Sequence, residues 1–212
     1  MPAPDLASLL EPATTAVLTM ELQRGVAGDL SFIPALAGAV ASTGAAVAAG
    51  EVCALARSAG ALVVHCTLEQ RPGGVGYRAN ARMLGMWARL RSPEGRLACE
   101  EGTPEAELMP EVGAQPTDVV APRHSGVTPF APSDLDTLLR NSGTRTVVVT
   151  GVSLNMGIPG LAMEAVNLGY DVVVVREAVA GFPAEYAAQV MDNSLVLLAT
   201  VVGLADLRAV WG

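Results

Sequence analysis

Residues 147–158 of the chain read VVVTGVSLNMGI, a β-branched run that stops at Gly151 and passes directly into a helix-like pattern. The pattern predicts a strand followed at once by a helix. In a parallel sheet such a corner lies at the carboxyl end of a strand, where ligands usually bind. The first turn of the helix also offers unpaired N–H groups to an anion. We therefore expect the active cleft here, although an ordinary tight connection with glycines kept for geometry explains the same residues.

The charge composition argues against nucleic acid as a partner. The 212 residues include 21 acidic and 13 basic side chains, so the net charge is -8 and the pI is near 4.7. A nucleic-acid backbone is bound by basic surfaces, and no basic cluster or RNA-type aromatic motif stands out. Every basic residue is an arginine, which excludes a lysine base, a Schiff base and a P-loop lysine from this chain.

Length, cysteine content and hydropathy predict a single cytoplasmic domain over residues 1–212. The three cysteines, Cys53, Cys66 and Cys99, lack metal-ligand spacing, and the N-terminus lacks a signal-peptide pattern. The apolar share is 51% and the mean hydropathy is +0.41, yet no apolar run reaches the roughly 18 residues of a membrane span. We assign the surplus to a buried sheet and a subunit interface. We expect a homo-oligomer, a dimer or tetramer, that takes a small-molecule substrate and needs no cofactor or metal.

Strand-like and helix-like segments alternate along the chain, with short joints. This order predicts a doubly wound parallel sheet covered on both faces. The predicted strands are residues 14–20, 62–66, 119–121, 147–150, 172–175 and 200–202. The predicted helices are residues 33–58, 77–91, 132–141, the stretch from the corner to 168, and 183–199. A loop-like stretch spans residues 92–116.

Polar side chains follow three of these strands at the edge where the corner lies. Glu21 follows the first strand and Arg123 follows the third, and we expect five further residues to line the cleft. Those five are Gln23 after the first strand, His124 and Phe130 after the third, and Ser153 and Asn155 at the corner.

Several other residues have a plain structural interpretation. His65 lies within a predicted strand and is more often a satisfied core histidine than a catalyst. Cys66 follows it, and a buried inert thiol is its default state. Residues 71–76 are glycine-rich, but their spacing does not match a dinucleotide fingerprint, so they predict a flexible loop.

Taken together, residues 15–23, the strand that ends at Arg123, and residues 150–155 resemble the isochorismatase-like cysteine hydrolases. Residues 164–170 and 192–193 extend the likeness over nearly all of residues 14–207. The resemblance implies a six-stranded parallel sheet in the order 3-2-1-4-5-6, a three-layer sandwich and usually a homo-oligomer. It also implies a cis peptide at Val152–Ser153.

Members of that family typically use an aspartate, a lysine and a cysteine at positions where this chain has Glu21, Arg123 and Gly157. Glycine offers no thiolate, so covalent acyl-enzyme catalysis at residue 157 is excluded. Isochorismatases proper are similar in carrying a small residue there, and in them a carboxylic acid protonates the substrate directly.

Two hypotheses follow from the altered triad. In the first, Glu21 acts as a general acid or base, since a carboxyl group at an apolar cleft can hold a proton near neutral pH. Arg123 then clamps a substrate carboxylate, and the resemblance implies that the Ser153 and Gly157 amides form an oxyanion hole. In the second, the chain is a catalytically silent homologue that binds a ligand or a partner protein, and Glu21 and Arg123 form an ion pair that closes the old site.

Overall fold

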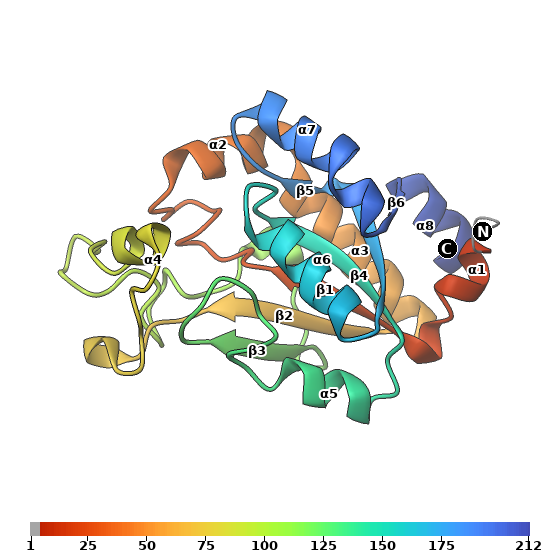
Figure 1. Ribbon diagram of the computed structural model, residues 1–212, viewed down its shortest axis with the longest axis horizontal. Coiled ribbons are helices and arrows are strands. Elements are labelled where there is room, and N and C mark those ends of the chain that lie inside the picture. Colours follow the sequence, from red (N-terminus) through yellow and green to blue (C-terminus); the bar gives the residue numbers. More distant parts are fainter. Residues whose placement is uncertain (1–4) are drawn as a thin grey trace.

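A six-stranded sheet forms the centre of the molecule (Figure 1). The computed structural model describes residues 5–212, so the first four residues of the predicted domain lie outside the described part. The strand order is β3-β2-β1-β4-β5-β6, and all adjacent strands are parallel. The predicted sheet is thereby confirmed. Its strands are β1 (Thr15–Met20), β2 (Leu62–Leu68), β3 (Val119–Arg123), β4 (Thr146–Val152), β5 (Asp171–Ala180) and β6 (Thr200–Val202).

Helices cover both faces of this sheet. One face packs against α2 (Pro34–Thr43), α3 (Ala45–Ala59) and α8 (Leu204–Trp211), and the other against α5 (Leu135–Asn141), α6 (Gly157–Asn167) and α7 (Ala184–Asn193). Two shorter helices are α1 (Leu6–Leu9) and α4 (Arg82–Trp87). Single 3-10 turns occur at Pro12–Thr14, Pro72–Gly74, Pro110–Val112 and Leu195–Leu197.

The valine run of β4 explains why the centre of the sheet is so apolar. Val147, Val148 and Val149 are all fully buried. Val148 belongs to the core on the α3 side, whereas Val147 and Val149 belong to the core on the α6 side. A parallel strand covered on both faces needs an apolar residue at every position rather than at alternate positions. Each such side chain contributes about 1.5–3 kcal/mol on burial.

The helix predicted over residues 33–58 is wrong in one respect, because it forms two helices. Gly44 has a φ of 70° and caps the end of α2, and α3 begins at the next residue with the two axes bent by 61°. A residue in the left-handed conformation, which glycine adopts most readily, commonly ends a helix. No single described helix is long and apolar enough to cross a membrane, and only this bent pair passes that test jointly, by length and composition.

Other boundaries also differ from the prediction. The helix expected over residues 77–91 is reduced to α4, and the residues before it include Gly73, Gly74 and Gly76, all at positive φ. The strand expected over 172–175 continues to Ala180, because a register shift lets β5 stay paired with the end of β4. The helix expected over 183–199 stops at Asn193 and is followed by a 3-10 turn.

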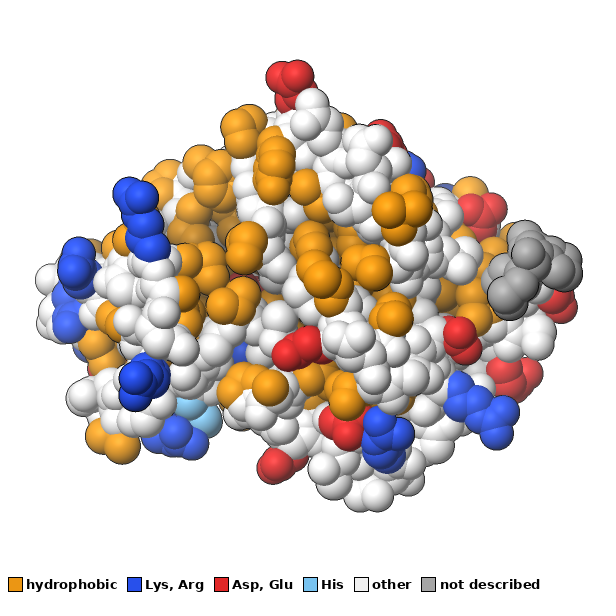
Figure 2. All heavy atoms as spheres, viewed as in Figure 1, with side chains coloured by type: hydrophobic (Ala, Val, Ile, Leu, Met, Phe, Trp, Pro, Cys, Tyr) orange, Lys and Arg blue, Asp and Glu red, His pale blue; other side chains and the backbone are white. Residues whose placement is uncertain are grey.

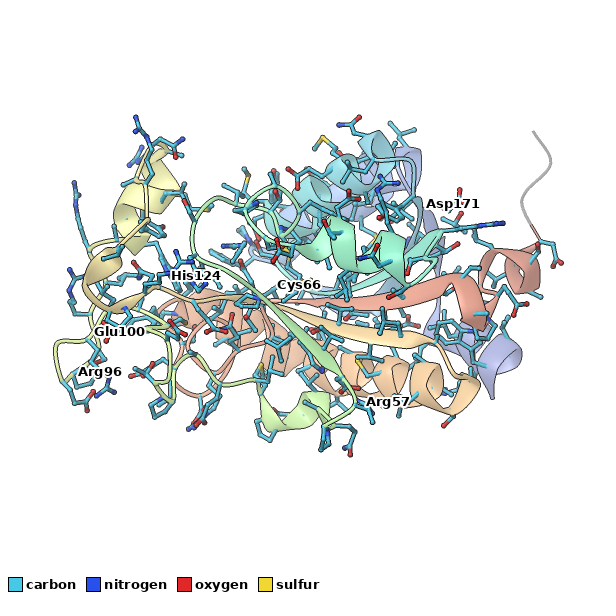
Figure 3. All side chains as sticks on the ribbon, turned by 90° about the horizontal axis from the view of Figure 1, so that it is seen from below. Arg57, Cys66, Arg96, Glu100, His124 and Asp171 are labelled. Carbon is cyan, nitrogen blue, oxygen red and sulfur yellow. The ribbon has the colours of Figure 1, made fainter. Side chains whose placement is uncertain are left out.

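A buried polar network joins β1, β2, α3 and the start of β3. The His65 side chain is fully buried, with Nδ1 at 2.8 Å from Thr19 Oγ1 and Nε2 at 3.1 Å from Asp118 Oδ2. Asp118 also accepts two hydrogen bonds from Arg57 of α3, a residue labelled in Figure 3. Burial lowers the pKa of His65 below its ordinary value of 6.5, and the neighbouring Asp118 offsets this only in part. His65 is thus a satisfied core histidine.

This network predicts a stability that depends on pH. As the pH falls below about 6.5, the unfolded chain takes up a proton at His65 while the folded chain resists it, so the free energy of unfolding should fall. A His65→Gln variant lacks this proton uptake, so its stability should change less with pH, although its absolute stability is lower. Urea unfolding between about pH 7.5 and 5.5 measures both slopes. The control is His124→Gln, which should keep the wild-type dependence of stability on pH. If His65→Gln kept the same dependence, the assignment would be contradicted.

Candidate active site

Glu21 and Arg123 form an ion pair at the carboxyl end of the sheet. Glu21 follows β1, has a φ of 51°, and donates its backbone N–H to Cys66 O at 2.9 Å. Arg123 ends β3, and its Nη2 donates to Glu21 Oε1. The two side chains are 14% and 5% exposed. The pair therefore reaches across the end of β2, which lies between β3 and β1 in the sheet.

Arg123 remains a cation in this environment. Burial lowers its pKa from 12.5 to about 10, which still leaves the guanidinium protonated at neutral pH. Its Nη1 donates to Gly126 O at 3.3 Å, so one edge of the group is fixed by the loop after β3. A buried charge is stable only when it is paired, and removing one partner of such a pair costs about 3–5 kcal/mol.

The predicted strand-to-helix corner lies beside this pair. β4 ends at Val152, the Val152–Ser153 peptide is cis, and α6 begins at Gly157. Ile158 N donates to Ser153 O at 3.0 Å, which closes the first turn. Within residues 5–212, neither the Ser153 amide nor the Gly157 amide has a hydrogen-bond acceptor. Two backbone donors of the corner are therefore free for a ligand.

A small cavity of about 90 Å³ contains the whole arrangement. Glu21, Arg123, Ser153 and Gly157 all line it. Its remaining walls are mostly apolar and come from the loop after β1, α2, β2, α4 and the loop after β3. These wall residues are Val26, Ile33, Leu36, Leu68, Tyr77, Met83, Leu84, Trp87, Gly126, Val127 and Met156. The site thus combines one carboxylate, one guanidinium and two free amides with an apolar enclosure.

Four predicted cleft residues lie outside this lining. Gln23 is fully buried, and its amide group bonds Leu68 N and O and Ala106 O. Asn155 bonds both backbone polar groups of Phe182. Phe130 stacks on Tyr170 in the core, and His124 Nδ1 lies 2.9 Å from Glu69 O (Figure 3). These side chains hold the loops around the site.

The sequence did not reveal the wall that α4 supplies. Tyr77, Leu84 and Trp87 lie far along the chain from the strand ends that carry the polar groups. The one signal was the helix expected over residues 77–91. Two of its large apolar residues, Met83 and Trp87, line the cavity, whereas Met86 is exposed. The loop that carries this helix follows no regular pattern, so its position over the site could not be predicted.

No group of three or more His, Cys, Asp or Glu side chains that could hold a metal ion occurs among residues 5–212. The three cysteines are buried, and burial raises the pKa of the Cys66 thiol to about 12. A thiolate at neutral pH is therefore disfavoured at Cys66, the cysteine nearest the strand ends.

Gly157 is packed so closely that a side chain would crowd its neighbours. A Cβ atom there would lie 3.0 Å from Met20 Cε and 3.0 Å from the backbone oxygen of Val152, which cannot move aside. We expect Gly157→Ala to be destabilising, since overpacking costs about 1–3 kcal/mol and the better helix propensity of alanine returns about 1 kcal/mol. Thermal unfolding measures the change. The matched control is Gly38→Ala in α2, where a Cβ meets no atom within 4 Å and stability should rise. Equal stabilisation by both substitutions would contradict the packing at Gly157.

Comparison with known proteins places this geometry in a family. Residues 15–206 match the isochorismatase domain model. Ureidoacrylate amidohydrolase RutB of Pseudomonas syringae is 30% identical over 85% of this chain and 76% of its own length. Maleamate amidohydrolase of Pseudomonas putida is 34% identical over 59% of this chain and 55% of its own length. A solved isochorismatase family protein from Desulfovibrio vulgaris superposes with a TM-score of 0.76 at 26% identity, over 93% of this chain and 97% of its own. The chain belongs to the isochorismatase family, whose hydrolase fold it has.

Proposed function

We propose that this protein is an isochorismatase-family enzyme that works without a cysteine nucleophile. Its substrate is a small metabolite with a carboxylate, Glu21 is the general acid or base, and Arg123 is the anion clamp. The observation that carries this proposal is that Glu21, Arg123, Ser153 and Gly157 line one cavity, and that the amides of the last two have no acceptor among residues 5–212. Three groups that attract negative charge therefore surround a single proton-transfer group.

The proposed chemistry follows from the charges. Glu21 is paired with Arg123. A substrate carboxylate that binds Arg123 brings a second negative charge close to Glu21, and like charges favour the protonated form of one of them. Glu21 can then donate that proton to the reacting atom. The Ser153 and Gly157 amides would stabilise negative charge that develops on an oxygen, and one such donor is worth roughly 3 kcal/mol.

The named relatives support a small acyl substrate. The two amidohydrolases are named for ureidoacrylate and maleamate, and both names denote carboxylates. Gly157 cannot form a covalent acyl intermediate, so a reaction on a similar compound here would have to proceed by proton transfer or by direct attack of water. This distinction makes acid or base chemistry from Glu21 the central element of the proposal.

A catalytically silent ligand-binding protein is the second candidate. It is favoured by one observation, namely that the Glu21–Arg123 pair satisfies itself and the cavity beside it is only about 90 Å³. Ligand pockets for larger molecules are usually about 300–1,000 Å³. A binding protein of this kind would retain ligand affinity and show no turnover.

Replacement of Glu21 separates the two candidates. Purified protein is incubated with isochorismate, maleamate and ureidoacrylate, and conversion is followed by proton NMR. We expect the wild type to convert a carboxylate-bearing compound and Glu21→Gln to lower the rate by about 10²–10⁴-fold, the usual contribution of general acid or base catalysis.

The control for this experiment is Glu107→Gln, which removes a carboxylate from an exposed ion pair with Arg24. Its rate should equal that of the wild type. Because Glu21→Gln leaves Arg123 unpaired, circular dichroism and a melting curve establish that each variant is folded at the assay temperature. Undiminished activity in folded Glu21→Gln would refute the mechanism, and binding without conversion by the wild type would favour the silent homologue.

We also infer that the chain forms a homo-oligomer through α6 and α7. Figure 2 shows hydrophobic side chains gathered over these helices. They include Met163 and Val166 of α6, Tyr186 of α7 and Leu197 of the following turn, with exposed fractions from 41% to 82%. Exposed apolar side chains grouped in this way are typical of subunit contacts.

Light scattering after size-exclusion chromatography tests this inference. The wild type should have at least twice the mass of one chain, 21.7 kDa, and Val166→Glu should shift the protein towards the monomer, because it places a charge in the contact. The control is Val47→Glu, an exposed valine of α3. A monomeric wild type would exclude the oligomer.

A further inference from the structure

Trp87 carries a buried hydrogen-bond donor without a partner. The residue is 7% exposed, it lines the cavity, and its indole Nε1 has no acceptor among residues 5–212. Buried polar atoms are nearly always hydrogen-bonded, so such an atom calls for an explanation. The second tryptophan, Trp211, shows the ordinary state, because its Nε1 donates to Leu10 O at 2.9 Å.

The segment that carries Trp87 is attached to the rest of the protein by apolar contacts. We call residues 71–96 the arm; it includes α4 and lies at one end of the molecule (Figure 1). Among the described residues, the hydrogen bonds of residues 72–90 all stay within the arm. Trp87 contacts Phe32 edge to face, with ring centroids 5.9 Å apart. A polar tie to the rest of the described chain comes only at the end of the arm, where Arg96 pairs with Glu105, so apolar contacts hold the part around Trp87.

The arm also concentrates positive charge. It contains six of the thirteen arginines and only one acidic residue, Glu94, in a chain with a net charge of -8. Figure 2 shows these blue side chains around the end formed by the arm. Five of them are exposed and form no ion pair within the described part of the chain, namely Arg71, Arg78, Arg82, Arg89 and Arg91. The prediction that the chain has no basic cluster is wrong for the arm.

We propose that Trp87 is a ligand-binding residue whose indole N–H donates to an oxygen of an anion held by Arg123. This inference rests on the proposed function and deepens it. The Arg123 guanidinium, the Trp87 indole N–H and the Ser153 and Gly157 amides are all donors, and the last three have no acceptor among residues 5–212, so a ligand that satisfies them needs acceptor oxygens. The arm supplies one of those donors, and its free arginines attract an anion towards the site. The enclosed volume of about 90 Å³ equals about three water molecules, so the part of the ligand inside is as small as a short carboxylate.

The indole resonances of the wild-type protein test this proposal. With only two tryptophans in the chain, a ¹H–¹⁵N spectrum contains two indole signals, which Trp87→Phe and Trp211→Phe assign. Acetate and propionate are the probes, with acetamide and propionamide as uncharged controls. We expect the carboxylates to move the Trp87 indole proton downfield in a saturable way and to leave Trp211 unchanged. Trp87→Phe should weaken carboxylate binding about tenfold or more, as expected for loss of a hydrogen bond to a charged group.

Failure of this inference is distinguishable from failure of the proposed function. If the carboxylates move the Gly157 amide and the Arg123 guanidinium signals but not the Trp87 indole, the anion binds without Trp87, and only the further inference is overturned. If no signal of the cavity moves with either carboxylate, the anion site itself is absent and both proposals are overturned. If acetamide and propionamide shift the Trp87 indole signal as much as the carboxylates do, Trp87 does not select an anion and the further inference is overturned.

Discussion

The site depends on one interaction, the buried ion pair between Glu21 and Arg123. Both side chains are nearly withdrawn from water, so each needs the other, because an unpaired charge in this position is costly. The pair joins the ends of β1 and β3 across β2, which fixes the floor of the cavity. It also sets the requirement for a ligand, which must offer Arg123 a negative charge comparable to that of Glu21.

A second constraint is the close approach of β4 to β1. A Cβ atom on Gly151 would lie 2.2 Å from Met20 O, and the residue has a φ of 102°, so only glycine fits where the two central strands end together. Six residues further on, Gly157 is confined by Met20 and Val152 in a similar way. Both glycines therefore keep the start of the corner tight against the end of β1. Ser153 and Gly157 of this corner line the cavity with backbone amides that have no acceptor among residues 5–212.

The sheet and the edge where Glu21 and Arg123 meet could be predicted because both depend on local patterns, while the reactive role of these two residues stays a prediction. A β-branched run ending at Gly151, with polar residues directly after the strands, determines both the sheet and the edge where Glu21 and Arg123 meet. The lining could not be predicted in the same way. Gln23 and Asn155 have polar side chains that suit ligand binding equally well. Both side chains are instead hydrogen-bonded to backbone groups, Gln23 to Leu68 and Asn155 to Phe182. Trp87 reaches the cavity through an irregular segment, whose path depends on apolar contacts with distant residues such as Phe32.

The three altered positions make physical sense as a set. A side chain at residue 157 would bring its Cβ to 3.0 Å from both Met20 Cε and Val152 O, whereas glycine avoids this crowding and keeps the backbone amide. Arginine at 123 stays charged despite burial and offers several donors in one plane, which suits two carboxylates at once. One can be Glu21 and the other a ligand. In the proposed mechanism a shared cation takes the place of a nucleophile, so the proposed chemistry depends on which carboxylate Arg123 holds and on where the proton of the pair resides.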